Sequence, residues 1–287
     1  MKFVLLFGST GMLGRYVLTY LSTDTTLCVV PIKRENYDAS IDDYKKLEYL
    51  LKPYDGIDAV CINCIGIIPQ KESNNQSKLY MKVNALFPQV LSQLCDKMNI
   101  RLIHITTDCV FNGNTTTSYS EDSIHTETNI YGISKSLGEP TNACVIRTSI
   151  IGEELIGKKS LLEWIKSNKN GTINGFVNHM WNGVTCLELA KIIHQIIKQN
   201  NYWSGVRHIF SPNIVSKYEL ANMINEIWDL NISINKFETD IVNKTLTTKY
   251  KTNNAFEIKN LYEQLEELKK WSLDYREDIE HHLYWNI

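Results

Sequence analysis

Tyr131, Lys135 and Thr107 are the residues of this sequence whose types and spacing point most directly to catalysis. Tyr131 and Lys135 stand four positions apart, which places both side chains on one face of a helix. A lysine beside a tyrosine stabilises the phenolate and lowers the tyrosine pKa from about 10 toward neutrality, so the phenol can protonate a carbonyl during reduction. Thr107 ends a strand-like run, at the edge where parallel sheets hold their active sites. Because a Tyr–Lys pair alone is more often a surface pair, the interpretation depends on this strand.

A glycine-rich loop directly follows the first apolar run, Phe3–Phe7. It has the spacing G-x-x-G-x-x-G and opens a helix-like stretch. Glycines permit a tight turn and let backbone N–H groups approach a pyrophosphate, whose charge a helix N-terminus stabilises. The loop predicts a dinucleotide site rather than a plain strand-to-helix turn. Its contact residues are expected to be Gly8, Thr10, Gly11, Met12, Leu13 and Gly14.

The end of the second apolar run decides which dinucleotide is expected. A site specific for NAD would place Asp or Glu there for the ribose hydroxyls, whereas this chain has Lys33 and Arg34. Two cations suit a 2′-phosphate, so NADPH is favoured, although a solvated pair at the start of a loop is the alternative. Asp38 is a candidate for contacting the adenine amine or is a turn residue.

These segments together resemble an extended short-chain dehydrogenase/reductase, and within it the dTDP-4-dehydrorhamnose reductases. The resemblance rests on the glycine loop, on Thr-Asp-Cys-Val-Phe-Asn-Gly at 107–113 and on Tyr-Gly-Ile-Ser-Lys-Ser-Leu-Gly-Glu at 131–139. Val83-Asn84-Ala85 and Val145-Ile146-Arg147-Thr148 add to it, and beyond residue 150 it is loose. It implies that Thr107 polarises a sugar ketone, that Tyr131 donates the proton, and that Lys135 tunes Tyr131 and binds the nicotinamide ribose.

Cys109 departs from the reductase pattern, which has a tyrosine at this position. Two related groups resemble this chain here: GDP-fucose synthases and the plant-type UDP-4-keto-6-deoxyglucose 3,5-epimerase/4-reductases. In both, the cysteine is similar to an acid/base that takes a proton from the carbon beside the ketone. A thiol with a pKa near 8.5 can do this when a nearby cation lowers that pKa. The alternative is that Cys109 fills the core, as expected for the other six cysteines.

The second acid of such an epimerase is expected in the segment after Arg147. Lysines at Lys158, Lys159 and Lys166 are available there, and their register is ambiguous. Lys159 is preferred because it begins the helix nearest the family's substrate-facing position. A surface lysine is the alternative for each of them.

The composition limits the class of protein. The chain has 287 residues, 43% of them hydrophobic and 22% charged, and a net charge of −2. This near-neutral balance argues against a nucleic-acid or polybasic membrane partner, and no apolar run reaches the roughly 18 residues that a membrane span needs. Seven cysteines without a zinc-site spacing indicate free thiols in a reducing compartment, so a cytoplasmic location and no metal site are expected.

Alternating apolar and amphipathic stretches predict the fold. The first half is typical of stacked βαβ units, which predicts an α/β protein with a Rossmann-type doubly wound parallel sheet. We expect a dinucleotide-binding domain over residues 1–150, joined by 183–202, and a smaller α/β substrate-binding region over 151–287. The expected strands are Phe3–Phe7, Leu27–Ile32, Ala59–Ile62, Leu102–Thr106, Ala143–Arg147 and Gly205–Phe210. The expected helices are Leu13–Leu21, Ile41–Leu51, Tyr80–Met98, Tyr131–Glu139, Leu161–Lys169, Leu187–Gln199, Lys217–Trp228 and Leu261–Trp271.

The main functional hypothesis is a bifunctional enzyme. It would epimerise C3 and C5 of a nucleotide-linked 4-keto-6-deoxy sugar and then reduce C4 with NADPH, giving UDP-L-rhamnose. One alternative is a dTDP-4-dehydrorhamnose reductase without epimerase activity. A second is a non-catalytic dinucleotide-binding regulatory subunit, against which the joint presence of Thr107, Tyr131 and Lys135 argues. The resemblance implies that a homodimer could form through helices beside the catalytic one. The sequence leaves the oligomeric state open.

Overall fold

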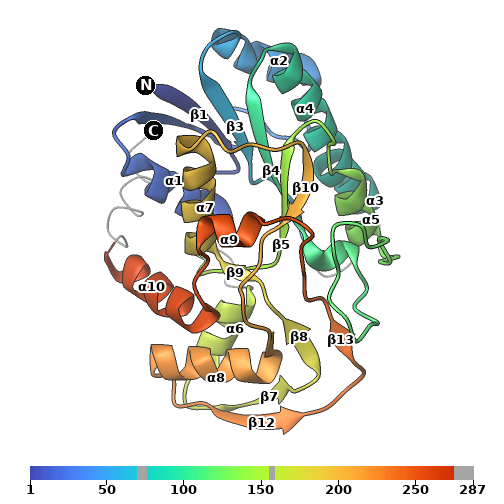
Figure 1. Cartoon of the computed structure of the whole chain (residues 1–287), viewed down its shortest axis with the longest axis vertical. Helices are drawn as coiled ribbons and strands as arrows, with labels where there is room; N and C mark the ends of the chain where they lie inside the picture. The colour runs from blue at the N-terminus through green and yellow to red at the C-terminus, as the bar shows by residue number, and fades with distance from the viewer. Residues whose placement is uncertain (70–75, 155–158, 275–287) are drawn as a thin grey trace. The chain divides into compact units, whose positions relative to one another are not determined.

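The structure is a computed structural model that describes residues 1–69, 76–154 and 159–274. The chain forms two compact units, each drawn in Figure 1. Unit 1 comprises Met1–Asn112, Ile124–Arg147 and Lys191–Arg207. Unit 2 comprises Gly113–Ser123, Thr148–Ala190 and the described chain from His208 onward.

The sheet of unit 1 runs β10-β5-β4-β3-β1-β2 within the described residues. Adjacent strands from β2 to β4 are parallel. The chain passes from β1 outward to β2 and then returns to β3 on the other side of β1, so the strand order reverses between β1 and β3. This is where open α/β sheets bind their ligands, outside the carboxyl ends of the strands. The strands are β1 Lys2–Phe7, β2 Leu27–Ile32, β3 Ala59–Asn63, β4 Arg101–Thr107, β5 Cys144–Thr148 and β10 Gly205–His208.

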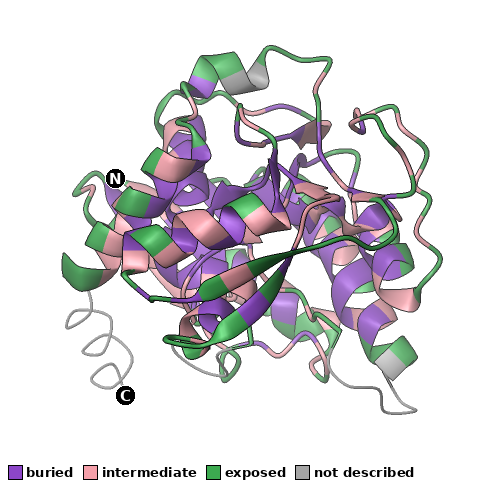
Figure 2. Ribbon diagram, turned by 90° about the horizontal axis from the view of Figure 1, so that it is seen from below, coloured by how far each residue is buried: buried purple, intermediate pink, exposed green. Residues whose placement is uncertain are grey.

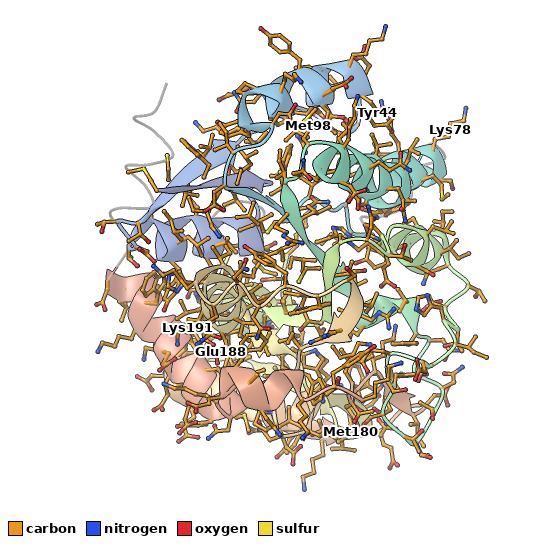
Figure 3. The ribbon with its side chains drawn as sticks, turned by 45° about the horizontal axis from the view of Figure 1, so that its top comes forward. Tyr44, Lys78, Met98, Met180, Glu188 and Lys191 are labelled. Atoms are coloured by element: carbon orange, nitrogen blue, oxygen red, sulfur yellow. The ribbon has the colours of Figure 1, made fainter. Side chains whose placement is uncertain are left out.

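Amphipathic helices cover both faces of this sheet. Figure 2 shows such helices buried along one side and exposed along the other, as expected where a helix packs on a sheet. Leu47 of α2 and Leu91 of α4 are fully buried in one core cluster with Leu5 of β1. Tyr44 and Met98 belong to the same packing between α2 and the end of α4 (Figure 3). The helical elements are α1 Met12–Ser22, α2 Tyr44–Leu51, η1 Lys52–Tyr54, α3 Gln76–Tyr80, η2 Met81–Leu86, α4 Phe87–Lys97, η3 Asp108–Val110, α5 Ile130–Leu137 and the end of α7 Cys186–Lys198.

The helix predicted over Tyr80–Met98 is confirmed from Tyr80 to Lys97, but it is not α-helical throughout. A π-helical turn, η2, separates α3 from α4. Pro88 has no N–H group, so it cannot donate an α-helical hydrogen bond to the carbonyl of Asn84. The π-helical turn contains Asn84 and lies directly before this proline. A periodicity of apolar residues does not reveal such a turn, because the spacing of buried positions on either side is still helical.

Unit 2 contains smaller sheets and its own helices. Within the described residues, β7 Thr172–Phe176 pairs with β12 Ser233–Phe237, and β8 His179–Trp181 lies between β11 Val215–Ser216 and β13 Val242–Asn243. Helix α8, Lys217–Trp228, begins with a capping box, in which the Ser216 hydroxyl accepts from the N–H of Glu219 and the Glu219 carboxylate accepts from the N–H of Ser216. The remaining elements are β6 Ile150–Ile151, β9 Val184–Thr185, α6 Leu161–Ser167, α9 Thr252–Phe256 and α10 Leu261–Asp274.

The division into units differs in two places from the boundary predicted at residue 150. The segment Gly113–Ser123 belongs to unit 2, because Tyr119 exchanges backbone hydrogen bonds with Thr245 and Thr247. The segment that returns to unit 1 is Lys191–Arg207 rather than 183–202. Both differences come from pairings between residues far apart in sequence. Local patterns carry no information about such pairings.

Candidate active site

A cavity of about 250 Å³ lies at the carboxyl ends of β1, β2 and β3. Gly8 and Gly11 line it from the loop after β1, Arg34 and Asp38 from the loop after β2, and Gly66 from the loop after β3. The cavity therefore lies at the point where the strand order reverses. It combines close backbone approach, the start of helix α1 and a guanidinium group, which are the features that bind an anionic dinucleotide.

The residues predicted for the dinucleotide fall into two sets. Gly8, Thr10, Gly11, Arg34 and Asp38 line the cavity, whereas Met12, Leu13, Gly14 and Lys33 do not. The side chain of Arg34 is 84% exposed, with its Nε 3.7 Å from Asp38. The Lys33 ammonium lies 3.7 Å from Glu35 instead. Asp38 also accepts hydrogen bonds from the backbone and hydroxyl of Ser40, so it orders its own turn.

Gly14 has a packing role behind the loop. A Cβ atom at Gly14 would lie 2.0 Å from the carbonyl oxygen of Gly8. Gly8 itself has a φ of +77°, in the left-handed region that favours glycine. These two glycines let the first turn of α1 lie against the loop after β1. The third glycine thus acts through helix packing rather than through the cavity wall.

The second half of the site begins where β4 ends. The Thr107 hydroxyl accepts a hydrogen bond from the N–H of Cys109 at 3.1 Å and contacts the Asp108 carboxylate at 3.1 Å. The Cys109 thiol lies 3.6 Å from the same carboxylate oxygen. Thr107 and Cys109 are half-buried, whereas Asp108 is only 4% exposed. The short helix η3 thus holds one hydroxyl and one thiol at the carboxyl edge of the sheet.

Helix α5 supplies Tyr131 and Lys135. Its N-cap residue, Asn129, accepts a hydrogen bond from the N–H of Gly132 at 2.8 Å. A Cβ at Gly132 would lie 2.7 Å from the carbonyl oxygen of Cys109, so the first turn of α5 packs directly against η3. Tyr131 forms a hydrogen bond with Thr107, and the Lys135 ammonium lies 3.4 Å from the carbonyl of Ile105.

The cavity and the α5 pair adjoin each other. The Lys135 ammonium lies 3.5 Å from the position that a Cβ at Gly66 would take, and Gly66 lines the cavity. Lys135 therefore adjoins the predicted dinucleotide site and lies one helical turn after Tyr131 on α5. This arrangement brings Thr107, Cys109, Tyr131 and Lys135 together within unit 1.

The pKa values differ from the simple expectation for a Tyr–Lys pair. Burial raises the pKa of Tyr131 above its ordinary value, the neighbouring Cys109 adds to the rise, and the hydrogen bond with Thr107 opposes it. Burial lowers the pKa of Lys135 to about 8, while the charge of Glu139 opposes this change. The expected lowering of the Tyr131 pKa is therefore not found, because burial outweighs it. A phenol that keeps its proton remains a competent proton donor.

Asn84 is a buried polar residue of this region whose contacts the sequence did not indicate. Its side-chain oxygen accepts from the N–H of Ile67, and its nitrogen donates to the carbonyl of Ile67, both at 2.9 Å. The same nitrogen lies 3.2 Å from the hydroxyl of Ser134 on α5. Asn84 thus fixes the loop after β3 to α5. Its only sequence signal was the resemblance of Val83-Asn84-Ala85.

Residues 1–252 match the family model described as the RmlD substrate binding domain. The chain belongs to the RmlD substrate binding domain family. This family, the glycine loop and the strand order agree with the Rossmann-type α/β fold and with the extended dehydrogenase/reductase membership expected from the sequence.

Similar proteins and structures agree with the RmlD assignment. The dTDP-4-keto-6-deoxy-D-glucose reductase of Streptomyces niveus is 27% identical over 228 residues, which cover 75% of each chain. A probable low-salt glycan biosynthesis reductase of Haloferax volcanii is 28% identical, over 77% of this chain and 78% of the other. A dTDP-4-dehydrorhamnose reductase of Bacillus anthracis, solved in complex with NADP, superposes with a TM-score of 0.80 at 17% identity. That superposition covers 95% of this chain and all (100%) of the other. It confirms the fold.

The lysines predicted to follow Arg147 in this RmlD chain are in unit 2. Lys159 is exposed, and its backbone N–H donates to Glu154 at 2.5 Å. The Lys166 ammonium forms an ion pair with Glu153 at 2.6 Å. Lys158 lies outside the described residues. The role of Lys159 stays a prediction, because Cys109 belongs to unit 1.

The seven cysteines, all within the described residues, form no disulfide bond, and two of the six expected in the core are only partly buried. Cys28 is half-buried on β2, and Cys64 lines the dinucleotide cavity. Burial raises the pKa of Cys64 to about 12, so its thiol stays protonated at neutral pH. Cys64 therefore forms part of the cavity wall.

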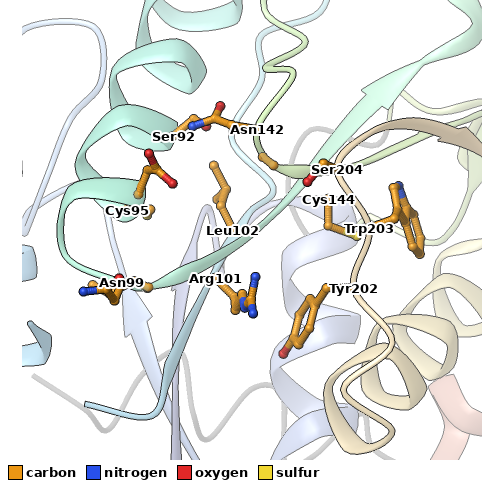
Figure 4. Close-up of a pocket in the computed structure, with 13 residues that line it drawn as sticks. Ser92, Cys95, Asn99, Arg101, Leu102, Asn142, Cys144, Tyr202, Trp203 and Ser204 are labelled. Atoms are coloured by element: carbon orange, nitrogen blue, oxygen red, sulfur yellow. The ribbon is translucent and has the colours of Figure 1, made fainter. Parts of the chain in front are cut away.

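A further cavity of unit 1, of about 400 Å³, lies at the opposite end of the strands (Figure 4). Arg101 and Cys144, the first residues of β4 and β5, line it together with Tyr202. The Arg101 guanidinium lies 5.7 Å from the centre of the Tyr202 ring. Because the cavity is at the amino ends of these strands, it is separate from Thr107 at the carboxyl end of β4.

The described residues show neither a cluster of metal ligands nor a membrane-spanning helix. No group of three or more His, Cys, Asp or Glu side chains in that part of the chain is arranged to hold a metal ion. None of the helices described there is both long enough and apolar enough to span a bilayer.

Proposed function

We propose that this chain reduces the C4 ketone of a nucleotide-linked 4-keto-6-deoxy sugar with NADPH as the hydride donor. The observation that carries the proposal is the convergence of Thr107, Tyr131 and Lys135 beside a cavity with a dinucleotide-type loop. The names of the RmlD relatives from S. niveus and B. anthracis support the choice of a 4-keto sugar.

The residues around the cavity fit NADPH. Gly8 and Gly11 give backbone access for the pyrophosphate, and the exposed Arg34 guanidinium suits a 2′-phosphate. Lys135 is the residue expected to hold the nicotinamide ribose. When bound, the cofactor supplies the hydride.

The chain's own residues perform the proton chemistry. The hydroxyls of Thr107 and Tyr131, which share a hydrogen bond, would both approach the C4 oxygen and polarise the ketone. The phenol then gives its proton to that oxygen, and the Lys135 ammonium stabilises the phenolate that remains. Because burial keeps Tyr131 protonated, the donor is in the required state at neutral pH.

The decisive experiment is a product assay with the purified full chain. NADPH is supplied with dTDP-linked 4-keto-6-deoxy sugars, before and after treatment with a separate 3,5-epimerase, and the products are identified by NMR. We expect reduction at C4, with Tyr131→Phe inactive in the same assay. If no nucleotide-linked keto sugar oxidises NADPH, the reductase proposal is wrong and a regulatory dinucleotide-binding subunit becomes the better interpretation.

Cys109 supports a second candidate, 3,5-epimerisation by the same chain with UDP-L-rhamnose as the product. The thiol is half-buried in the same site and contributes to raising the pKa of Lys135, so the two groups interact. The thiol also donates to the Asp108 carboxylate at 3.6 Å, so its proton is engaged in that contact. The reductase alone is therefore the first proposal.

The epimerase candidate has its own test. UDP- and dTDP-4-keto-6-deoxyglucose are incubated in D₂O with the enzyme but without NADPH, and deuterium at C3 and C5 is measured. Epimerisation would introduce deuterium into the sugar in the presence of the parent chain, but not in the presence of Cys109→Ala. Lys159→Met tests the second acid in the same assay. Equal background exchange in all samples would eliminate this activity.

A homodimer through α5 and its neighbours is the assembly we propose. Leu86 of η2 and Leu137 of α5 are 49% and 53% exposed, and both line an apolar surface hollow with Met81. Burial of such side chains would favour association. Sedimentation of the parent chain and of Leu86→Glu tests this assignment. A parent chain that sediments as a monomer would contradict it.

A further inference from the structure

Arg147, near the end of β5, is a buried cation with partners beside the helix that carries Tyr131 and Lys135. Arg147 is only 2% exposed, so its guanidinium group needs hydrogen-bond acceptors within the protein. Its Nε donates to Glu139 at 3.0 Å, and a terminal nitrogen donates to the other carboxylate oxygen of Glu139 at 2.6 Å. The same terminal nitrogen lies 2.7 Å from Nε2 of His125.

Two of these contacts lead to α5. Glu139 stands two residues after Leu137, where α5 ends. Nδ1 of His125 lies 2.5 Å from the hydroxyl of Ser136, the neighbour of Lys135. Arg147 is therefore connected to the C-terminal end of α5 both directly, through Glu139, and through His125.

A third contact leads to the segment that carries Thr107 and Cys109. The guanidinium carbon of Arg147 lies 5.2 Å from the centre of the Phe111 ring, and Phe111 is the C-cap residue of η3. The ring of His125 meets the Phe111 ring edge-on, with centroids 5.6 Å apart. One side chain thus contacts both segments that adjoin the catalytic groups.

The protonation state of His125 follows from the donors around it. An arginine has only N–H donors, so Nε2 of His125 must accept, and its Nδ1–H must donate to Ser136. A proton on Nε2 would face the guanidinium across 2.7 Å. Glu139, 3.8 Å from Nε2, is the acidic group nearby, and Arg147 is the basic one. Burial, together with Arg147, lowers the pKa of His125, which keeps the imidazole neutral.

We propose that Arg147, Glu139 and neutral His125 form a positioning unit that holds α5 against η3 and so keeps Tyr131 aligned with Thr107. The kinetic consequence of this unit rests on the proposed reductase activity, whereas its geometry does not. Protonation of His125 removes the acceptor for Arg147 and releases one of the two connections to α5. The turnover number kcat therefore falls on the acid side, whereas NADPH binding is preserved.

The test compares pH profiles of kcat and KM for the parent chain and four variants, using NADPH and the keto sugar that the parent reduces. His125→Gln can still accept from Arg147 and donate to Ser136, so it should keep kcat within about threefold at pH 8 and lose the acid limb. His125→Phe and Arg147→Lys should lower kcat tenfold or more, with KM for NADPH changed less than threefold. His194→Gln is the matched control and should have the pH profile of the parent. The His194 ring contacts Asp24, in the loop that follows α1.

Outcomes that overturn the proposal are equally specific. An unchanged acid limb in His125→Gln, or a parent-like kcat in Arg147→Lys, would show that the unit does not position Tyr131. A fall in kcat matched by loss of NADPH binding would make it a general folding element instead.

An independent readout separates this proposal from the reductase proposal. In ¹⁵N-histidine NMR spectra of the full chain, the signal absent from His125→Gln should show a protonated Nδ1 and an unprotonated Nε2 from pH 8 down to about 6. If that pattern is present but no keto sugar is reduced, the proposed function has failed and the geometry stands. If the tautomer is the opposite one, the positioning unit is wrong.

Discussion

The carbonyl oxygen of Asn84 lies 1.8 Å from the position that a Cβ atom would occupy at Gly138. Gly138 is the C-cap residue of α5, and Asn84 is in the π-helical turn η2. The end of the helix that carries Tyr131 and Lys135 therefore touches the backbone of η2. The absent side chain at Gly138 makes this approach possible.

Gly138→Ala should destabilise the fold because the obstacle is backbone that no side-chain rotation can remove. Overpacking of this kind costs roughly 3 kcal/mol. We expect a lower urea midpoint and reduced turnover, since α5 must shift. Gly56→Ala is the control: Gly56 has a φ of +72° but nothing within 4 Å of a Cβ, so only backbone strain of about 1 kcal/mol is expected. Equal midpoints for the two variants would contradict the contact.

Tyr131→Phe should remove the proton donor without disturbing the cavity. A positioned general acid contributes about 10² to 10⁴-fold to a rate, so kcat for keto-sugar reduction should fall by that factor. The NADPH dissociation constant, measured by fluorescence, should change less than threefold. Tyr80→Phe is the matched control, because the Tyr80 ring lies edge-on to Tyr131 with centroids 6.1 Å apart. A variant Tyr131→Phe that retains a tenth of the parent kcat would exclude its role as the acid.

Lys135→Met should raise the stability of the cofactor-free chain while abolishing turnover. The pKa of Lys135 is about 8 in the folded chain against 10.5 ordinarily, so burying the ammonium opposes folding. That penalty is complete below pH 8 and disappears as the pH rises from about 8 to 10.5, because only the unfolded chain is then protonated. At pH 7 the gain should be roughly 1 to 3 kcal/mol.

The measurement for Lys135→Met is urea unfolding at pH 7 and at pH 10. The advantage of the variant over the parent should shrink at the higher pH. Lys45→Met, at an exposed position on α2, should leave the urea midpoint unchanged at both values. A variant Lys135→Met that is less stable than the parent at pH 7 would refute the account of Lys135 burial.

Arg34→Ser should weaken the preference for NADPH over NADH. Arg34 lines the dinucleotide cavity, and loss of a charge-assisted hydrogen bond costs about 1.5 to 3 kcal/mol. We expect KM for NADPH to rise tenfold or more and KM for NADH to stay within about twofold. Lys33→Ser is the matched control, because Lys33 pairs with Glu35 and does not line the cavity. Similar effects of the two substitutions would assign the 2′-phosphate contact to both cations.

Local sequence patterns predicted the individual helices and strands and the types of residue that form the site. Strand β2 was predicted at its observed bounds, Leu27–Ile32, because a short apolar run is typical of a strand, and α8 at Lys217–Trp228, because its apolar residues recur at helical spacing. The G-x-x-G-x-x-G loop and the Tyr131–Lys135 spacing are local patterns too. They predicted a dinucleotide loop and a shared helix face without any knowledge of distant contacts.

How these elements meet depends on contacts between residues that are far apart in the sequence. The buried pair of Arg147 and Glu139, the contact of Asn84 with Gly138 and the raised pKa of Tyr131 all depend on residues from separate elements. Desolvation acts on a side chain according to everything packed around it, and most of those neighbours are remote in sequence. A Tyr–Lys spacing therefore predicts which groups face one another, whereas the fold decides how strongly each holds its proton.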